Sequence, residues 1–138
     1  MKTTAAALGL ALLACPAAAV DLHVSVTGVA HANGSVHIAL YDGAATFRDE
    51  DAARATASLP ATAGTVAADF SDLAPGTYAL IVYHDENGNG RMDRFLGMIP
   101  TEGYGLSNDP EVSGPPRFED SAFTVEGDRV AVSVPLNY

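Results

Sequence analysis

The stretch GTYALIVYHDENGNGRMD, residues 76–93, combines the strongest strand signal of the chain with its richest loop signal. Residues 77–83 carry almost no polar side chain on either face, which is typical of a strand in the middle of a sheet that is covered on both sides. Because side chains alternate along a strand, two buried faces are expected. One face should carry Tyr78, Leu80 and Val82, and the other Ala79, Ile81 and Tyr83. The rest of the fold should pack around this strand.

Apolar and polar side chains also alternate in shorter segments on both sides of the central strand, and this alternation predicts further strands. The segments are 22–26, 36–40, 55–59, 66–70, 122–125 and 130–136. The dipeptide Asn33-Gly34 favours a type I′ turn and predicts an antiparallel hairpin between the first two segments. Gly127-Asp128 predicts a second hairpin between the last two, and residues 47–55 are expected to form a loop with at most one or two helical turns. About seven short strands without a sustained helix indicate an all-β fold, an antiparallel β-sandwich.

A long segment after the central strand, residues 85–120, is rich in glycine and proline and has no sustained periodicity. Loops of this length in compact domains are usually functional or disordered. Large apolar side chains are interleaved throughout the segment, which argues that it is ordered. The sequence leaves two interpretations of it open: a binding surface, or a rigid cap whose tyrosines fill one end of the core.

The start of this loop has the spacing of a calcium site. Oxygen-bearing side chains stand at positions 1, 3, 5 and 9 of the calcium-loop pattern, and Gly90 stands at position 6, where the backbone must turn sharply. A hard cation prefers six to eight oxygen ligands, which alternate residues of a tight loop can supply from one side. The predicted metal ligands are Asp85, Asn87, Asn89 and Asp93 by their side chains and Arg91 by its backbone carbonyl.

The calcium pattern is incomplete. Position 12, where a bidentate glutamate is expected, is Leu96, so a remote acid would have to complete the shell, with Glu102 and Asp109 as the candidates. Few carboxylates imply weak affinity, on the order of 10⁻⁴–10⁻³ M. The same residues are also typical of a metal-free turn in which amides cap their own backbone. The sequence leaves both interpretations open, and no other cofactor is predicted.

No catalytic residue is predicted. The sequence contains no zinc-binding or nucleophile-elbow spacing. His84 stands beside Asp85, but neighbours in a strand point to opposite faces. His23 and His37 are expected on polar strand faces, as surface histidines or as a cross-strand metal pair. A non-enzymatic binding or structural module is therefore expected, and the alternative is an envelope- or carbohydrate-directed hydrolase that uses loop carboxylates.

The N-terminus predicts export. Residues 1–19 combine a basic start, an apolar run and a small-residue cleavage signal, which is typical of a secretory signal peptide, and cleavage near Ala19 leaves a single domain of residues 20–138. A periplasmic or secreted location in a bacterium follows. Cys15 offers an alternative, because the residues before it are similar to a lipobox, although lipid anchorage at Cys15 is not favoured.

The charge of the chain limits its partners. The formal net charge is −10, which disfavours nucleic acid and anionic lipid as partners. The apolar run near the N-terminus is too short for a membrane span, so no transmembrane segment is expected. The remaining partner classes are proteins, peptides and glycans.

Several separate motifs follow one another along the second half of the chain. These are LAPGTYAL at 73–80, HDENGNG at 84–90, FLG at 95–97, PTEGYGLSN at 100–108 and PRFEDSAF at 116–123. In this order they closely resemble family 2141 of the bacterial domains of unknown function. The resemblance implies a small exported β-sandwich without an established activity, and it carries over no catalytic residue.

The hairpin PGTY at 75–78 is also similar to that of transthyretin-like and carboxypeptidase regulatory-like domains, which are β-sandwiches. This similarity implies an Ig-like or transthyretin-like sandwich. Some transthyretin relatives hydrolyse 5-hydroxyisourate, but those end in a tyrosine-arginine-glycine-serine tail, whereas this chain ends in PLNY at 135–138. The difference argues against that activity.

Overall fold

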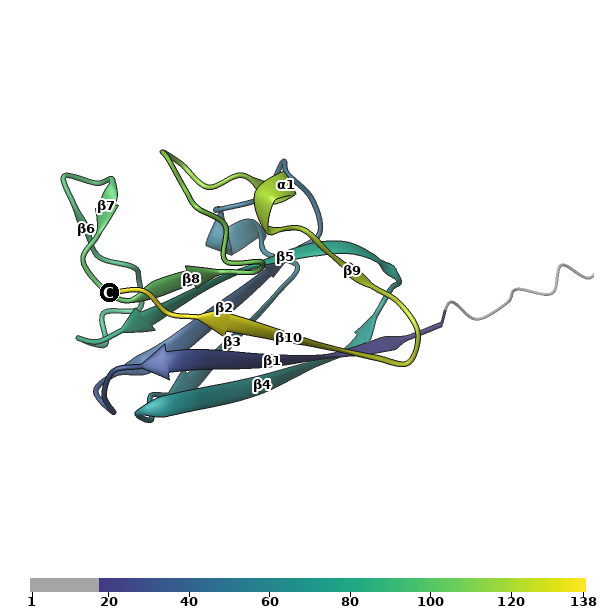
Figure 1. Cartoon of the computed structure of the whole chain (residues 1–138), viewed down its shortest axis with the longest axis horizontal. Helices are drawn as coiled ribbons and strands as arrows, with labels where there is room; N and C mark the ends of the chain where they lie inside the picture. The colour runs from purple at the N-terminus through teal and green to yellow at the C-terminus, as the bar shows by residue number, and fades with distance from the viewer. Residues whose placement is uncertain (1–17) are drawn as a thin grey trace, which may run out of the picture.

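Two β-sheets packed face to face form the body of the protein in the computed structural model (Figure 1), which describes residues 18–138. The first sheet has the order β10 (Arg129–Pro135), β1 (Val20–Val29), β4 (Gly64–Leu73). The second has the order β3 (Ala55–Pro60), β2 (Ser35–Tyr41), β5 (Gly76–Asp85), β8 (Tyr104–Leu106), with β9 (Phe123–Val125) beside the start of β5. The remaining elements are the hairpin of β6 (Arg94–Phe95) and β7 (Ile99–Pro100), the 3₁₀ turn η1 (Glu50–Ala52) and α1 (Phe118–Ser121).

The predicted all-β sandwich is confirmed, because each of the seven predicted segments forms a strand. Three further short strands, β6, β7 and β8, lie within the loop predicted at residues 85–120, which is therefore ordered. One strand pair differs from a purely antiparallel sandwich: β1 and β10 run parallel, with Leu22 opposite Val130 and Val26 opposite Val134. The predicted signal peptide up to Ala17, and Cys15 with it, lie outside the described residues.

Both predicted hairpins are wrong. β1 pairs with β4 and β10, whereas β2 pairs with β3 and β5, so the chain crosses from one sheet to the other at Asn33-Gly34. Gly34 has a φ of +70° and Asn33 has none in that region, so the turn is not type I′. β9 and β10 likewise lie in different sheets. A strand with alternating side chains buries its apolar face equally well whether the next strand pairs with it in the same sheet or lies in the facing sheet. Alternation therefore does not distinguish these two arrangements.

The core lies between the two sheets, and a smaller second cluster lies outside the second sheet. β5 contributes to both, as predicted: Tyr78, Leu80 and Val82 join the main core. On its other face, Ala79 packs with the second cluster, and Ile81 packs against it. The other buried members of the second cluster are Ala39, Tyr41, Phe47 and Leu106. β5 is therefore covered on both faces, which is the property that the sequence predicted for it.

The crossing at Gly34 generates a stability prediction. A Cβ at Gly34 would lie 1.8 Å from the carbonyl oxygen of Asp85, so Gly34→Ala combines a left-handed backbone with a backbone clash. We expect it to lower the free energy of unfolding by about 2–4 kcal/mol. Gly127→Ala is the matched control, because Gly127 has a φ of +78° and open space at its Cβ; it should cost only about 1 kcal/mol. Equal losses for the two variants in urea unfolding would contradict the packing argument.

Candidate functional site

The end of β5 holds a buried carboxylate. Asp85 is 1% exposed, and its oxygens accept hydrogen bonds from the backbone N–H groups of Asn89 (3.1 Å) and Gly90 (2.7 Å). Its Oδ2 also lies 3.6 Å from Nε2 of His37. A carboxylate at the first position of the loop therefore fixes the turn that follows, as the sequence pattern implies.

Asp93 closes the loop at its other end. The side-chain amide of Asn89 donates to both oxygens of Asp93 (2.8 and 2.9 Å), and the amide of Asn87 donates to Oδ2 (2.5 Å). These hydrogen bonds, those of Asn89 first, hold the pKa of Asp93 below its usual value. The four side chains predicted as metal ligands are thus brought together in one turn.

The loop is also capped in the manner of a metal-free turn. Oδ1 of Asn87 accepts from the N–H of Asn89 (3.1 Å), and Oδ1 of Asn89 accepts from the N–H of Arg91 (3.0 Å). The amide oxygens therefore face the backbone while the amide NH₂ groups face Asp93. A cation at this position would need these two amides to rotate, so that their oxygens replace the NH₂ groups.

Of the two remote acids, Glu102 joins the loop. Its carboxylate is buried, at 6% exposure, and bridges the loop ends by accepting from the N–H groups of Glu86 (3.0 Å) and Asp93 (3.0 Å). Asp109 lies beyond β8, which runs antiparallel to β5 and carries the chain away from the end of β5. The expectation for Asp109 is therefore wrong, because strand direction separates it from the loop.

A cluster that sequence reasoning missed lies on the other face of the β5 terminus. Nε2 of His31 lies 3.4 Å from Oε1 of Glu86, and the rings of His31 and His84 are 4.8 Å apart. His84 is fully buried, with Nε2 2.6 Å from the carbonyl oxygen of Asn33 and Nδ1 2.8 Å from the hydroxyl of Tyr138. His31 lies in the segment that crosses from one sheet to the other. Its contact with His84 therefore depends on the fold and could not be predicted from a residue spacing in the sequence.

The hydrogen-bond pattern of this cluster is that of a closed polar network. His84 donates from Nε2 to Asn33, which leaves Nδ1 to accept from the hydroxyl of Tyr138. Nδ1 of His31 accepts from the N–H of Asn33 (3.3 Å), so its Nε2 carries the proton directed at Glu86. Although the three candidate ligand atoms lie within 4.8 Å of one another, the ring nitrogens already have partners.

The alternative of a cross-strand metal pair between His23 and His37 does not hold, because β1 and β2 belong to different sheets. Both histidines lie on strand faces and are half-buried. His23 instead makes a 2.8 Å contact from Nδ1 to Asp69. His37 stacks on Tyr83, with ring centroids 4.8 Å apart and an angle of 6° between the planes.

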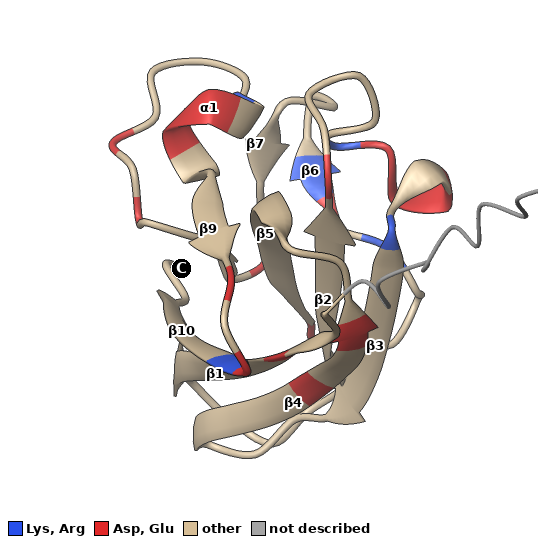
Figure 2. Cartoon of the chain, turned by 90° about the vertical axis from the view of Figure 1, so that its right-hand side faces the viewer, with Lys and Arg blue, Asp and Glu red and all other residues tan. Residues whose placement is uncertain are grey.

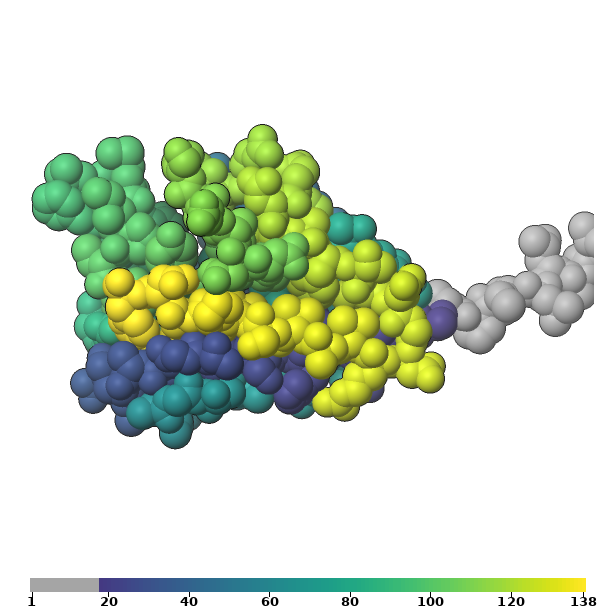
Figure 3. Space-filling model, viewed as in Figure 1, coloured from purple at the N-terminus to yellow at the C-terminus, as the bar shows by residue number. Residues whose placement is uncertain are grey.

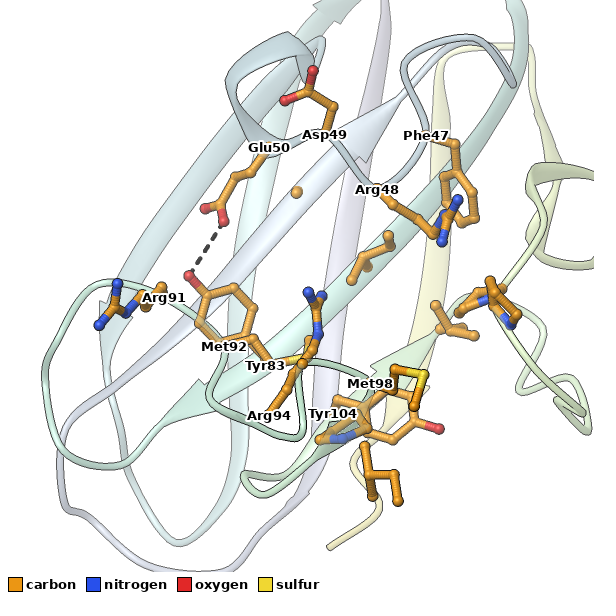
Figure 4. Close-up of a pocket in the computed structure, with 18 of the residues that line it drawn as sticks. Phe47, Arg48, Asp49, Glu50, Tyr83, Arg91, Met92, Arg94, Met98 and Tyr104 are labelled. Atoms are coloured by element: carbon orange, nitrogen blue, oxygen red, sulfur yellow. Dashed lines mark hydrogen bonds between the residues drawn. The ribbon is translucent and has the colours of Figure 1, made fainter.

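A groove of about 1020 Å³ lies on the outer face of the second sheet (Figures 3 and 4). Its floor is the face of the sheet that carries Tyr41, Ile81 and Tyr83. One wall is the loop at residues 47–50, and another is the segment 91–100 with the β6–β7 hairpin. The remaining lining comes from Tyr104, Leu106 and the turn Gly114, Pro115 and Pro116. The loop at residues 85–120 therefore borders a groove, while its residues Leu106 and Phe118 pack on the outer face of the second sheet.

Two tyrosines on the floor of the groove are held neutral. Burial, followed by the negative charges of Glu50 and Asp49, raises the pKa of Tyr41 to about 12. Burial, followed by the negative charge of Glu50, also raises the pKa of Tyr83, and the hydroxyl of Tyr83 donates to Oε2 of Glu50 (3.3 Å). Tyr83 is therefore a hydrogen-bond donor on the groove floor at every physiological pH.

A family model described as "Uncharacterized protein conserved in bacteria (DUF2141)" matches residues 24–133. The chain belongs to this family. The match to DUF2141 includes the loop at 85–93, Glu102 and every residue that lines the groove. The resemblance seen in the sequence is thereby confirmed. No curated protein and no solved structure matched the chain.

The family description names no activity. Among residues 18–138, no helix is long and apolar enough to cross a membrane.

The groove tyrosines give a pH prediction. The pKa of Tyr41 is about 12 in the folded state and about 10 in the unfolded state, so its contribution to stability is complete below about pH 10 and is lost as the pH rises through about 12. We expect tyrosinate absorbance to show a group that titrates near pH 12, together with loss of stability between about pH 10 and 12. Glu50→Gln should lower the pKa of Tyr41 and Tyr83. Ionisation of all the tyrosines near pH 10 in the folded protein would contradict this assignment.

Proposed function

We propose that this DUF2141 protein is an exported, non-enzymatic binding module. Its ligand occupies the groove on the outer face of the second sheet, and the loop at residues 85–93 binds calcium together with Glu102. The observation that carries the proposal is the groove itself, a concave surface lined by aromatic and apolar side chains with a few charged groups. Ligand sites of proteins usually have this composition, with volumes of about 300–1,000 Å³.

Calcium binding is supported by the two buried carboxylates of the loop. Asp85 and Glu102 are 1% and 6% exposed, and every hydrogen bond that their oxygens accept comes from a backbone N–H within the described chain. Burial of carboxylates is unfavourable unless positive charge or hydrogen bonds compensate for it. A calcium ion would supply that charge, and rotation of the Asn87 and Asn89 amides would turn two further oxygens toward it.

The calcium loop and the groove share a segment of chain. Arg91, Met92 and Arg94 line the groove and flank Asp93, the last predicted ligand in the loop. An ion held between Asp85, Asp93 and Glu102 would therefore fix the wall of the groove that the β6–β7 hairpin continues. This is the role that we assign to the metal: it orders a binding surface, with an affinity on the order of 10⁻⁴–10⁻³ M.

The alternative function is a hydrolase that uses loop carboxylates. A glycosidase requires two carboxyl groups that face each other across the substrate, about 5–10 Å apart. The acids that line the groove, Asp49 and Glu50, are neighbours on one wall, and Glu50 is engaged by Tyr83. Neither Glu102 nor Glu119 is part of the groove lining. These positions favour the binding role.

Export is supported by the sequence at residues 1–19 and by the position of the first strand. β1 begins at Val20, which follows directly on the predicted cleavage site and is fully buried. We expect the protein purified from the periplasm or medium of a bacterial host to have the mass of residues 20–138. A lipid adduct on Cys15, detected by intact-mass spectrometry, would contradict cleavage near Ala19.

Thermal unfolding in calcium tests the metal proposal. An ion that binds only the native state stabilises it by about 2.7 kcal/mol at a hundredfold excess over its Kd. We therefore expect about 10 mM Ca²⁺ to raise the Tm by several degrees, and chelator to reverse the rise. Magnesium at the same concentration should have a smaller effect, because Mg²⁺ demands octahedral geometry and gives up its water reluctantly.

Two variants sharpen this experiment. Glu102→Gln removes the charge and keeps one of the two hydrogen-bond acceptors that hold the loop. Relative to its own Tm without metal, it should lose most of the rise in calcium. Glu126→Gln is the matched control, since Glu126 is exposed in the turn between β9 and β10, in a part of the chain separate from the 85–93 loop. An unchanged Tm in calcium for the wild-type protein, or an equal rise in Glu102→Gln, would sink the calcium proposal.

A further inference from the structure

The arginines of this acidic protein are distributed unevenly. Figure 2 shows several of the basic segments around β6, while acidic segments are spread over the chain. Six arginines occur among the described residues, and three of them lie within 4.0 Å of a carboxylate. These three are Arg54 with Asp42, Arg117 with Asp120 and Arg129 with Asp69. The other three, Arg48, Arg91 and Arg94, all line the groove, and within residues 18–138 none of them has such a partner.

The charge of the groove differs in sign from that of the whole protein. Its lining carries three arginines and two acids, Asp49 and Glu50, whereas the chain has a formal net charge of −10. Glu50 is already engaged by the hydroxyl of Tyr83. A positively charged concave surface on an acidic protein is complementary to an anion, because a cleft lined by charges of one sign raises the local concentration of the opposite charge.

The positions of the guanidinium groups indicate which part of the groove would bind the anion. In Figure 4, Arg94 extends from its loop toward the middle of the groove, while the side chain of Arg48, on the opposite wall, lies beside Phe47. Arg91 lies at the rim, beyond Tyr83. Two guanidinium groups on facing walls can each donate paired hydrogen bonds to a planar anionic head such as a carboxylate.

Beside the arginines, the groove presents an apolar surface to solvent. Met98 and Ile99 line it and are 76% and 59% exposed. Phe95 and Leu96, at the tip of the same hairpin, are 60% and 75% exposed. Exposed apolar side chains gathered at one site usually mark a binding surface. A ligand that consisted of an anionic head alone would leave this surface uncovered.

We propose that the groove binds a small amphipathic anion, a single carboxylate or similar head on an alkyl or aryl body. Arg48 and Arg94 bind the head, and Met98 and Ile99 with the aromatic floor cover the body. This inference deepens the binding role proposed above, but it does not depend on calcium. Alkyl and aryl acids share this chemistry, and the test below separates them.

The test uses 8-anilinonaphthalene-1-sulfonate, a fluorescent aryl anion, as the probe of the mature protein. We expect saturable binding of one dye per chain with enhanced emission. Decanoate, an alkyl carboxylate, should displace the dye, whereas decanol at the same concentration should not. 1-Naphthoate in place of decanoate reports whether aryl acids compete better than alkyl acids.

The variant Arg48→Gln/Arg94→Gln removes both guanidinium groups from the groove. We expect it to bind the dye and decanoate at least about tenfold more weakly, because each loses charge-assisted hydrogen bonds. Arg117→Gln/Arg129→Gln is the matched control: it removes the same charge from arginines that pair with Asp120 and Asp69 outside the groove. The control should bind as the wild-type protein does, and circular dichroism checks that both variants are folded.

The outcomes separate this inference from the proposal on which it rests. If decanol displaces the dye as well as decanoate does, and both double variants bind alike, the groove binds apolar ligands and the anion inference is wrong. If the folded wild-type protein binds neither dye nor decanoate, the anion inference is overturned and the groove loses its support as a ligand site. Weakening confined to Arg48→Gln/Arg94→Gln, with displacement by decanoate and not by decanol, confirms the inference.

Discussion

The burial of β5 on both faces is the constraint on which the rest of the structure depends. Leu80 and Val82 are fully buried in the core between the sheets, while Ala79 is fully buried on the opposite face. β2 lies along one edge of β5, and β8 and β9 lie along the other. A strand held on both faces and both edges has little freedom to shift, so the residues at its end, His84 and Asp85, are fixed in position and direction.

Two structures are built on that fixed end. On one face, His84 joins the crossing between the sheets to the C-terminus through Asn33 and Tyr138. On the other face, Asp85 organises the loop, and Glu102 fastens the loop to the segment that returns as β8. The groove forms because this returning segment runs along the edge of the sheet and leaves part of the outer face uncovered. The groove is thus a consequence of how the loop is anchored.

The sequence predicted the strands well and their partners poorly. Alternation in segments such as 22–26 and 66–70 correctly marks which side chains are buried, because burial depends on local pattern. Alternation does not specify whether the next strand lies in the same sheet or in the facing sheet. For this reason the sequence predicts a hairpin at Asn33-Gly34, where the chain in fact crosses between the sheets. The spacing of the 85–93 loop is local too. Glu102, predicted as a remote acid in place of Leu96, does join this loop through the N–H groups of Glu86 and Asp93.

By itself, then, the sequence determined the β-sandwich class, the central strand at 77–83 and the turn that gathers Asp85 and Asp93, because each depends on residues a few positions apart. Only the tertiary structure decided that Arg48 and Arg94 face one groove and that His31 meets His84. Those side chains come from segments that are far apart in the chain, and their meeting is set by sheet order and by the crossing between sheets. Sheet order and the crossing between sheets produce no recognisable residue spacing in the sequence, because packing between distant strands is a property of the folded chain.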